Sequence, residues 1–171
     1  MSEKFVKAFE YVVGREGVFD DDPNDWGNWT GGKPGEGELK GTKYGISAKA
    51  YPDLDIASLS LDDAMLLYRR DYWMKCDCDS LPAGLALAVF DCAVNQGVKK
   101  AIQCLQRAAG VNDDGKIGPH TRAAIARLDP VIGVEYFQAE RILEYVTVPT
   151  WERFKRGWMR RVIGTAITAT R

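Results

Sequence analysis

Apolar residues recur at helical spacing along most of this chain, and that periodicity constrains the fold more than any other sequence feature. Clear alternation of apolar and polar residues, which a half-buried strand would require, never lasts for more than a few residues. One apolar stripe contains Leu85, Ala88, Val89 and Cys92, and similar stripes follow it toward the C-terminus. The sequence therefore predicts a mainly α fold.

Start and stop signals divide this pattern into separate helices. Ser60 and Asp63 form a capping-box-like start, Pro82 suits a first helical turn, and Gly97 and Gly110 are stops. A Gly-rich loop over residues 17–45 separates the first two helices, and a short hairpin is expected within it at Thr42 and Tyr44. The expected helices cover about residues 3–15, 61–74, 83–96, 99–109, 121–128 and 130–146, with a last helix from 151, and Thr121 and Thr150 are expected as caps.

No Pro-, Gly- or Ser-rich linker separates the two halves of the chain. The 171 residues suffice for one compact domain or for two small lobes around a continuous core. The N-terminal part offers only two strong helices and a long loop, which is a weak core for about 80 residues. We therefore expect residues 1–80 and 81–171 to pack as one compact unit.

Charge and cysteine content argue against several classes of function. The net charge of −1 provides no strong field for nucleic acid or an anionic membrane. Cys76 and Cys78 are too close for the usual zinc knuckle, and His120 is the one histidine. We expect free thiols, no metal site and no organic cofactor. A local basic patch suits either an anionic polymer or a solvated helix face, and its members are Arg153, Lys155, Arg156, Arg160, Arg161 and Arg171.

The stretch that follows the first apolar pattern holds the best candidates for acid–base chemistry. Glu16 lies between two glycines at the end of that pattern. A glutamate there can be partly desolvated, which raises its pKa toward the value a general acid needs, or it can be an ordinary solvated residue. Two carboxylates in different environments are the usual equipment for glycosidic cleavage. The loop after Glu16 supplies Asp20, Asp21, Asp22 and Asp25. A calcium site in this loop is disfavoured, because EF-hand spacing is absent.

Several motifs in order resemble a known family over roughly the first 80 residues. After Glu16-Gly17 and the Asp-rich loop come Asn28-Trp29-Thr30-Gly31-Gly32-Lys33, Gly41-Thr42-Lys43-Tyr44-Gly45-Ile46-Ser47, Tyr51-Pro52-Asp53-Leu54-Asp55-Ile56 and Tyr68-Arg69-Arg70-Asp71-Tyr72-Trp73. This series resembles glycoside hydrolase family 108, whose members are N-acetylmuramidases found mostly as phage and prophage endolysins. Val18 stands where a second glycine often occurs, and residues 27–41 lengthen the loop, but Glu16 is retained.

The second half resembles the predicted peptidoglycan domain that commonly follows family 108 modules. The resemblance rests on Phe90-Asp91, Asn95-Gln96-Gly97, the segment from Asp114 to Thr121, and Phe154-x-x-Gly157-Trp158-x-x-Arg161. The Asp114 motif also has a structural explanation, since its glycines and proline suit a tight connection between helices. Together the resemblances imply a lysozyme-like helical fold with a long loop or small hairpin near the active site.

The resemblance implies hydrolysis of the β-1,4 bond between N-acetylmuramic acid and N-acetylglucosamine. Glu16 would be the acid, with Asp25 as the first choice and Asp22 as the second choice for the assisting carboxylate. Thr42 would orient water, by analogy with the Glu–Asp–Thr set of phage-type lysozymes. The residues expected to bind substrate are Asp22, Trp29, Tyr44, Asn95 and Gln96, although the loop aromatics can equally pin the loop to the core.

The expected setting is the bacterial cell wall. No secretory signal or long apolar run is visible, so we expect cytoplasmic synthesis, no stable membrane insertion, and action in the periplasm or cell wall after release by a separate holin-like factor. The expected partner is the peptidoglycan glycan strand, acted on by a monomer during lysis of a bacterial host. The alternative is a non-catalytic peptidoglycan-binding or secretion-accessory protein, which the C-terminal resemblance suits equally well.

Overall fold

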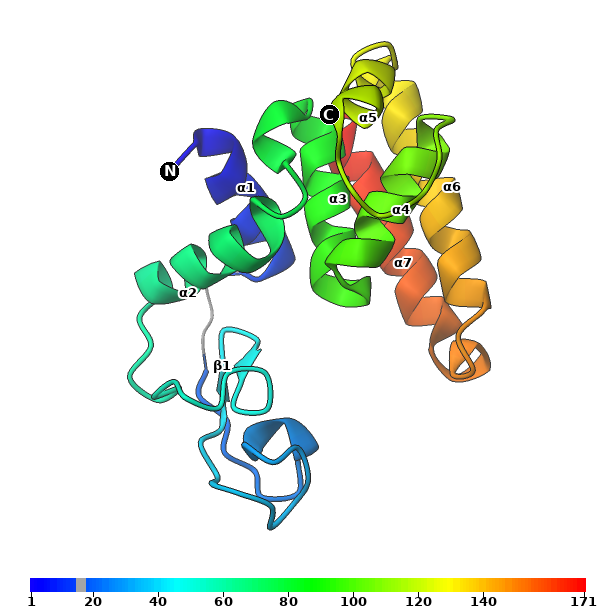
Figure 1. Cartoon of the computed structure of the whole chain (residues 1–171). Helices are drawn as coiled ribbons and strands as arrows, with labels where there is room; N and C mark the ends of the chain where they lie inside the picture. Colours follow the sequence, from blue (N-terminus) through cyan, green and yellow to red (C-terminus); the bar gives the residue numbers. More distant parts are fainter. Residues whose placement is uncertain (15–17) are drawn as a thin grey trace. The chain divides into compact units, whose positions relative to one another are not determined.

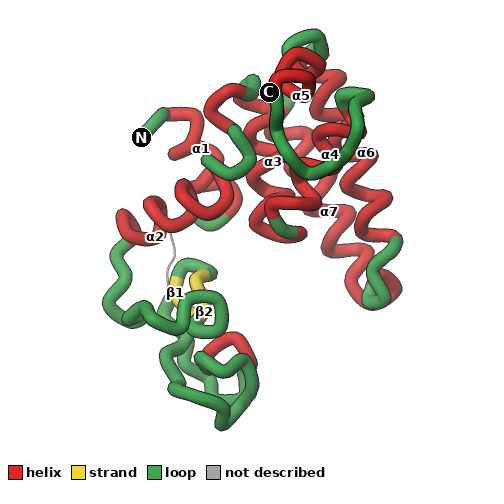
Figure 2. Tube along the Cα trace, viewed as in Figure 1, coloured by secondary structure: helices red, strands yellow, loops and turns green. Residues whose placement is uncertain are grey.

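The computed structural model describes residues 1–14 and 18–171, and these divide into two compact units. One unit, here called the helical unit, contains residues 1–8 and 69–171. The other, here called the loop unit, contains residues 9–68. Helix α1 (Glu3–Val12) contributes residues to both. Helices dominate the described chain and the single sheet has two short strands, which confirms the predicted mainly α class (Figure 2).

Helix α3 (Ala83–Gln96) is the centre of the helical unit. It packs against α4 (Val98–Ala108), α6 (Pro130–Val146) and α7 (Trp151–Ala169), and the short α5 (Pro119–Ile125) lies between α4 and α6 in the chain (Figure 1). Every side chain from Leu85 to Ala93 is buried, because neighbours cover α3 on several sides. Gly84 permits a close approach at its start, since a Cβ there would clash with the backbone carbonyl of Ala169.

An aromatic cluster joins the N-terminal residues to this helical unit. Phe5, Trp73 and Phe90 contact one another edge to face, with ring centroids 5.2, 5.6 and 6.0 Å apart, and all three side chains are fully buried. Such pairs stabilise a fold beyond the burial of their apolar area. The indole Nε1–H of Trp73 donates to Asp79 Oδ1 at 2.9 Å, so its polar group is satisfied.

A buried carboxylate connects α3 to both C-terminal helices. Asp91 Oδ2 accepts from Arg141 Nη1 of α6 at 2.6 Å, and Asp91 Oδ1 accepts from Arg161 Nη2 and Nε of α7 at 2.6 and 2.8 Å. Thr165 Oγ1 adds a longer bond of 3.3 Å. Burial acts to lower the pKa of Arg141, but the negative charge of Asp91 and other neighbouring groups raise it overall. The guanidinium therefore stays charged inside the protein.

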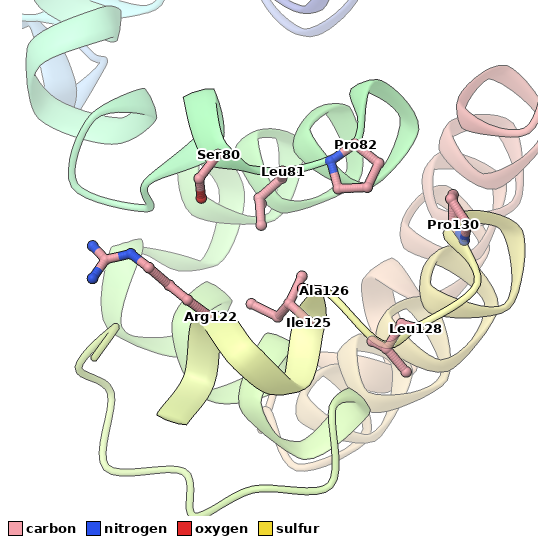
Figure 3. Close-up of a pocket in the computed structure, with 8 residues that line it drawn as sticks. All are labelled: Ser80, Leu81, Pro82, Arg122, Ile125, Ala126, Leu128 and Pro130. Atoms are coloured by element: carbon pink, nitrogen blue, oxygen red, sulfur yellow. The ribbon is translucent and has the colours of Figure 1, made fainter. Parts of the chain in front are cut away.

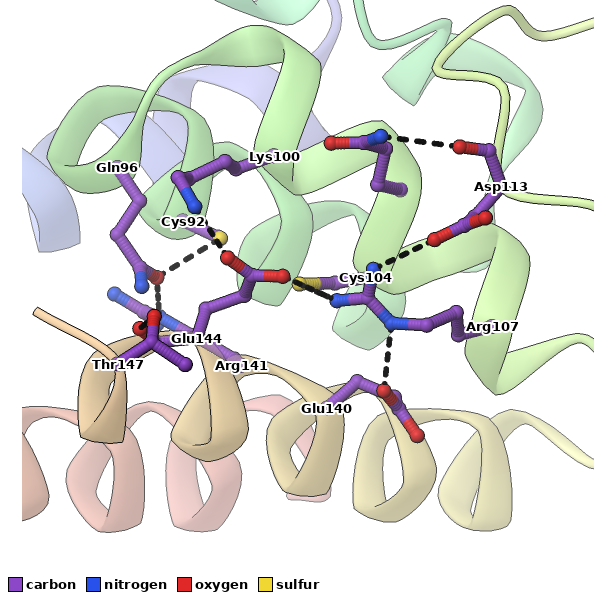
Figure 4. Close-up of polar contacts among 11 residues, drawn as sticks. Cys92, Gln96, Lys100, Cys104, Arg107, Asp113, Glu140, Arg141, Glu144 and Thr147 are labelled. Carbon is purple, nitrogen blue, oxygen red and sulfur yellow. Dashed lines mark hydrogen bonds and ion pairs between the residues drawn. The ribbon is translucent and has the colours of Figure 1, made fainter.

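A second ionic cluster joins α4 to α6 near the surface. Arg107 donates to Asp113 Oδ2 at 2.9 Å, to Glu140 Oε2 at 2.7 Å and to Glu144 Oε1 at 2.8 Å (Figure 4). Lys100 is also paired with Glu144. Because these charges form a network rather than a single exposed pair, they help to fix the relative position of the two helices.

The motif between Asp114 and Thr121 is held by one buried glutamine of α4. Gln106 Nε2 donates to Asp114 Oδ1 at 2.8 Å and to Thr121 Oγ1 at 3.3 Å, and Gln106 Oε1 accepts from Gly115 N at 2.8 Å. Gly115 has a φ of +76°. The structural explanation of this motif is therefore supported. Thr121 is not a cap, because it lies inside α5, whose N-cap residue is Gly118.

Side-chain capping bonds are present at the starts of α6 and α2, and no such bond is present at the start of α7. Asp129 Oδ1 accepts from the first backbone N–H groups of α6, at 2.9 and 3.1 Å. Ser60 and Asp63 form the expected reciprocal box at the start of α2 (Leu61–Tyr68), with bonds of 3.0 and 3.1 Å. Thr150 occupies the N-cap position of α7, but its side chain makes no capping hydrogen bond.

The loop unit has a small core around a hairpin whose two strands are two residues long. Strands β1 (Thr42–Lys43) and β2 (Ile46–Ser47) pair antiparallel, with Thr42 opposite Ser47. Tyr44 and Gly45 form the turn with φ values of +53° and +73°, as a two-residue hairpin loop of this type requires. Tyr68 Oη donates to Tyr44 O at 3.0 Å, which holds the turn against α2. The buried apolar residues are Phe9, Ile46, Ala48, Ile56, Leu59, Ala64 and Tyr68.

Two predicted helix ends differ from the structure. The first helix ends at Val12 rather than near residue 15, and α2 ends at Tyr68 rather than near Met74. Residues Arg69–Trp73 instead form a π-helical turn, and Met74 N bonds to Arg69 O at 2.9 Å. All four cysteines are free, as expected, and all four are buried. Burial raises the pKa of the Cys78 thiol.

A fragment of residues 1–80 should be poorly folded. It retains Phe5 and Trp73 but loses Phe90 and the whole of α3, so two large aromatic side chains would become exposed. The loop unit that remains is about 60 residues, a size at which a single core is marginal. Amide-proton NMR of the fragment should show poor dispersion beside the full chain. A well-dispersed spectrum would contradict the expectation that the two parts of the chain depend on each other.

Candidate active site

The acidic loop and the first strand of the hairpin are joined by a short backbone bridge. Asp20 N donates to Thr42 O at 2.9 Å, and Thr42 N donates to Asp20 O at 2.7 Å. Gly41 makes this approach possible. Its φ is +79°, and a Cβ there would lie 2.6 Å from Asp20 O and 2.6 Å from the ring of Phe19. Position 41 therefore requires glycine, and the backbone bridge fixes Thr42 beside the acidic loop.

A fully buried asparagine lies at the centre of this loop. Asn28 Nδ2 donates to Asp20 Oδ2 at 3.0 Å and to Asp22 O at 3.1 Å. Its Oδ1 accepts from Thr42 Oγ1 at 2.7 Å. Buried amides need all of their hydrogen-bonding groups satisfied, and here both ends of the amide have partners. The acidic loop and Thr42 are therefore connected through one side chain.

Asp25 and Thr42 border the same small surface. Asp25 is the N-cap of the 3₁₀ turn Trp26–Asn28, and its Oδ1 accepts from Gly27 N at 2.7 Å. A Cβ on Gly27 would lie 3.2 Å from Asp25 Oδ1 and 3.9 Å from Thr42 Oγ1. The Asp25 carboxylate and the Thr42 hydroxyl thus both lie near Gly27, which has no side chain. Within the described residues, Asp25 Oδ2 has no hydrogen-bond partner.

Three other candidate residues of this loop serve its internal structure. Asp22 Oδ1 accepts from the backbone and side-chain nitrogens of Asn24, both at 2.9 Å. Trp29 Nε1 donates to Pro23 O at 2.9 Å, so this indole pins the loop. Tyr44 forms the hairpin turn, and its ring lies 5.7 Å from Lys43 Nζ. These contacts favour a loop-ordering role for Asp22 and Trp29, alongside any contact with ligand.

Glu16 lies outside the described residues, so its position relative to Asp25 and Thr42 is not given by the structure. The structure does add two residues that the sequence interpretation missed. Asn28 appeared only as part of a motif, and Asp20 only as one of four carboxylates in the loop, with no role assigned. Asp20 is exposed, but it is also bonded to Asn28 and bridged to Thr42. A loop without periodicity carries no signal for such contacts.

Asn95 and Gln96 line a pocket of about 210 Å³ in the helical unit, at the C-terminal end of α3. Gln96 Oε1 accepts from Arg141 Nε at 3.1 Å and from Cys92 Sγ at 3.2 Å, as Figure 4 shows. Asn95 Nδ2 donates to Asp91 O at 3.0 Å. The pocket also has an aromatic wall and an ion pair, and its other lining residues are Lys100, Glu144, Tyr145, Val148 and Trp158.

The aromatic wall of this pocket is a stacked pair. The rings of Tyr145 and Trp158 are nearly parallel, with centroids 4.6 Å apart. Tyr145 is buried beneath this stack, so Trp158 is the member of the pair with surface left for a ligand. Asn95 and Gln96, the two residues predicted from sequence in this part of the chain, therefore line one pocket beside an aromatic ring.

A larger pocket of about 620 Å³ lies between α5 and the start of α3, and it does not carry comparable chemistry (Figure 3). Its one charged residue, Arg122, is already paired with Asp77 at 2.7 Å. The remaining lining is mostly apolar, from Leu81, Pro82, Ile125, Ala126, Leu128, Pro130 and Ser80. Pocket size alone therefore does not locate the active site in this chain.

Among the residues that the structure describes, no group of three or more His, Cys, Asp or Glu side chains is arranged to hold a metal ion. In the acidic loop, carboxylates have hydrogen-bond partners within the protein. Asp20, Asp22 and Asp25 each accept hydrogen bonds from nearby protein groups, so these carboxylates order the loop.

Two families match successive parts of this chain, and the boundary between the two matches lies within the helical unit. Residues 9–97 match the family described as Glycosyl hydrolase 108, and residues 100–163 match the family described as Predicted Peptidoglycan domain. No curated protein matches the chain. Among solved structures, it is similar to that of Brucella abortus SagA, with a TM-score of 0.78 and 29% identity over 97% of this chain and 93% of the other.

The first match spans more than half of the chain and includes the acidic loop, Thr42 and all of α3. The similarity to a solved structure extends over nearly the whole length and confirms the lysozyme-like, mainly α fold. The peptidoglycan match begins within α4 and ends within α7. The chain therefore belongs to glycosyl hydrolase family 108, and it is a glycoside hydrolase of the peptidoglycan-hydrolysing type.

Proposed function

We propose that the protein is an N-acetylmuramidase that cleaves the β-1,4 bond between N-acetylmuramic acid and N-acetylglucosamine. Protonated Glu16 donates its proton to the leaving glycosidic oxygen. Asp25 stabilises the positive charge that develops on the sugar or positions water, and Thr42 orients that water through its hydroxyl. Two carboxylates with separate roles meet the chemical requirement of glycosidic cleavage.

The observation that carries this proposal is the pairing of Asp25 and Thr42 around Gly27. These two residues are 17 positions apart in the sequence, and the fold brings both polar groups within 4 Å of the point where a Cβ of Gly27 would lie, with Ser47 Cβ at 3.7 Å. A carboxylate oxygen and a hydroxyl at such a surface can contact a sugar or a water molecule directly.

Substrate binding is proposed for both units. In the loop unit we assign Asp22, Trp29 and Tyr44 to substrate contact, and Trp26 adds an indole that is 58% exposed. In the helical unit we assign Asn95 and Gln96, which line the 210 Å³ pocket with its stacked aromatic wall. Residues 1–80 would then supply the catalytic part and residues 81–171 the peptidoglycan-binding part of one functional unit.

The biological setting proposed for this activity is lysis of a bacterial host, as for an endolysin of a phage or prophage. The protein would act as a monomer in the periplasm or cell wall, released from the cytoplasm by a separate holin-like factor. Within the described residues, no helix combines the length and apolar content needed to cross a membrane.

The alternative is a non-catalytic peptidoglycan-binding or secretion-accessory role. A sedimentation assay separates the two: purified insoluble peptidoglycan is incubated with the protein and then pelleted. The pellet reports bound protein, and the supernatant reports newly released reducing sugar. Hydrolysis predicts sugar release that grows with time and clearing of outer-membrane-stripped cells. Binding without any release of reducing sugar would contradict the proposed function and favour the accessory role.

Asp25→Asn should lower the rate of hydrolysis by roughly 10- to 100-fold, as expected when one oriented electrostatic group is lost. The asparagine retains an oxygen that can accept the bond from Gly27 N, so the 3₁₀ turn should persist. Asp21→Asn is the matched control, because it removes the same charge from an exposed neighbour. Initial rates on purified peptidoglycan measure both. An Asp25→Asn protein as active as the Asp21→Asn protein would refute the role of Asp25.

A complementary variant adds an atom instead of removing a charge. Gly27→Ala places a methyl group beside Asp25 Oδ1 and Thr42 Oγ1, at a residue whose φ is not positive. We expect a folded protein whose activity falls about tenfold, since small displacements of reacting groups have large effects on rate. Gly157→Ala on α7 is the control, because its Cβ would meet open space. Equal activity of the two variants would argue against a site at Gly27.

A further inference from the structure

The hydrogen bonds around Asn28 fix which way its side-chain amide is turned. Asp20 Oδ2 belongs to a carboxylate and Asp22 O to a backbone carbonyl, and both of these oxygens accept hydrogen bonds. The amide nitrogen of Asn28 must therefore face them, at 3.0 and 3.1 Å. Two independent acceptors thus fix the orientation of the side-chain amide.

That orientation determines what Thr42 does. With its nitrogen turned to Asp20 and Asp22, Asn28 presents its carbonyl oxygen to Thr42 Oγ1, 2.7 Å away. A carbonyl oxygen cannot donate, so the single hydroxyl proton of Thr42 is committed to Asn28. The lone pairs of Thr42 Oγ1 are then what remains for any other ligand, and the hydroxyl can only accept from that ligand.

We propose that Asn28 is a positioning residue for hydrolysis: together with Asp20, it holds the Thr42 hydroxyl as a hydrogen-bond acceptor for the attacking water. This inference rests on the proposed function of the site. A water molecule bound in this way donates a hydrogen bond to Thr42 Oγ1 and has a lone pair available for the sugar carbon. Without Asn28 the hydroxyl can rotate, and it can then also donate to the water and occupy that lone pair.

The arrangement forms a closed ring, which makes it rigid. Asp20 bonds to Asn28 through its side chain and to Thr42 through its backbone, while Asn28 bonds to Thr42. The backbone oxygen of Asn28 also accepts from the nitrogens of Lys40 and Gly41, at 3.0 and 3.1 Å. Asn28 is fully buried, so solvent does not compete for the amide. A neutral, buried residue is thereby able to control the direction of a partly exposed hydroxyl.

A double-mutant cycle tests this role. Asn28→Ala and Thr42→Val should each lower the rate at saturating peptidoglycan by roughly 10- to 100-fold, with little change in the amount needed for half-saturation. If Asn28 acts through the Thr42 hydroxyl, the double variant should be no slower than the slower single variant. Thr42→Ser should restore most of the rate, because serine keeps the hydroxyl. Effects that multiply in the double variant would overturn the inference.

Asn28 is buried, so a second cycle changes an exposed residue, Asp20, whose replacement tests the same role without disturbing the core. Asp20→Ala removes an acceptor of the Asn28 amide from an exposed position, so the fold should tolerate it. It should slow hydrolysis less than Asn28→Ala does, because Asp22 O still accepts from the amide, and the double variant with Thr42→Val should be no slower than Thr42→Val alone. Asp21→Ala is the matched control and should leave the rate unchanged. Multiplying effects of Asp20→Ala and Thr42→Val would contradict the proposal even if Asn28→Ala does not fold.

The cycle also distinguishes this inference from the proposed function. If the unmodified protein releases no reducing sugar from peptidoglycan, the proposed function fails and the role of Asn28 fails with it. If the unmodified protein is active and depends on Glu16, but Asn28 and Thr42 act independently, the positioning role alone fails. Melting temperatures of all variants, measured in parallel, show whether any loss of rate reflects unfolding.

Discussion

Glu16→Gln should lower peptidoglycan hydrolysis by about 10²- to 10⁴-fold, the usual effect of losing a general acid. Glutamine has nearly the same shape as glutamate but carries no proton that it can give to the glycosidic oxygen. The circular dichroism spectrum and the melting temperature should stay close to those of the unmodified protein. Rates of reducing-sugar release and of clearing of stripped cells measure the effect.

Glu3→Gln provides the matched control for that substitution. Glu3 lies at the exposed start of α1, where it pairs with Lys7 at 2.7 Å, and exposed pairs of this kind contribute little to stability. Its replacement should leave activity unchanged. A Glu16→Gln protein with the activity of the Glu3→Gln protein would exclude Glu16 as the acid, and the mechanism would have to be abandoned.

Asp91→Ala should reduce the free energy of unfolding by about 3–5 kcal/mol, the range expected when one partner of a buried ion pair is removed. The carboxylate is 1% exposed and Arg141 is fully buried, so the variant would leave an unneutralised guanidinium inside the helical unit. Its remaining partners, Gln96 Oε1 and Tyr145 Oη, are neutral. Denaturant unfolding curves measure the loss.

Arg161→Gln tests the asymmetry within the same cluster. Arg161 also pairs with Asp91, but its side chain is 36% exposed and can be hydrated. Its replacement leaves Asp91 with its fully buried partner Arg141, so the loss should be clearly smaller than for Asp91→Ala. Equal destabilisation by the two variants would show that burial of Arg141 is not the source of the effect.

Much of the helical framework could be predicted from the sequence, because it depends on local signals. The helix expected over residues 130–146 coincides with α6, and Gly97 ends α3 as predicted. The π turn at Arg69–Trp73 could not be predicted in this way, since the helical pattern of Tyr68 and Tyr72 continues across it. Thr150 does occupy the N-cap position of α7 but makes no side-chain capping bond, whereas Thr121 lies inside α5 and contacts Gln106.

The candidate site was predictable only in part, because its contacts join residues far apart in the sequence. Asp25 and Thr42 were chosen by motif order, and the fold brings both to Gly27. Asn28 had no comparable signal. A polar residue in a long loop is normally solvated, and its burial depends on the return of the chain from Gly41 to Thr42. Glu16 remains a prediction from sequence, outside the described residues.

The measurement that most directly tests the proposed activity is the identity of the new reducing ends in digested peptidoglycan. Purified peptidoglycan is digested with the protein, the products are reduced with borohydride, and mass spectrometry identifies the terminal sugar alcohol. Cleavage between N-acetylmuramic acid and N-acetylglucosamine by a muramidase predicts reduced muramic acid at the new ends, and its absence from digests with the Glu16→Gln protein. New ends of reduced glucosamine, or products unchanged from undigested peptidoglycan, would contradict the account.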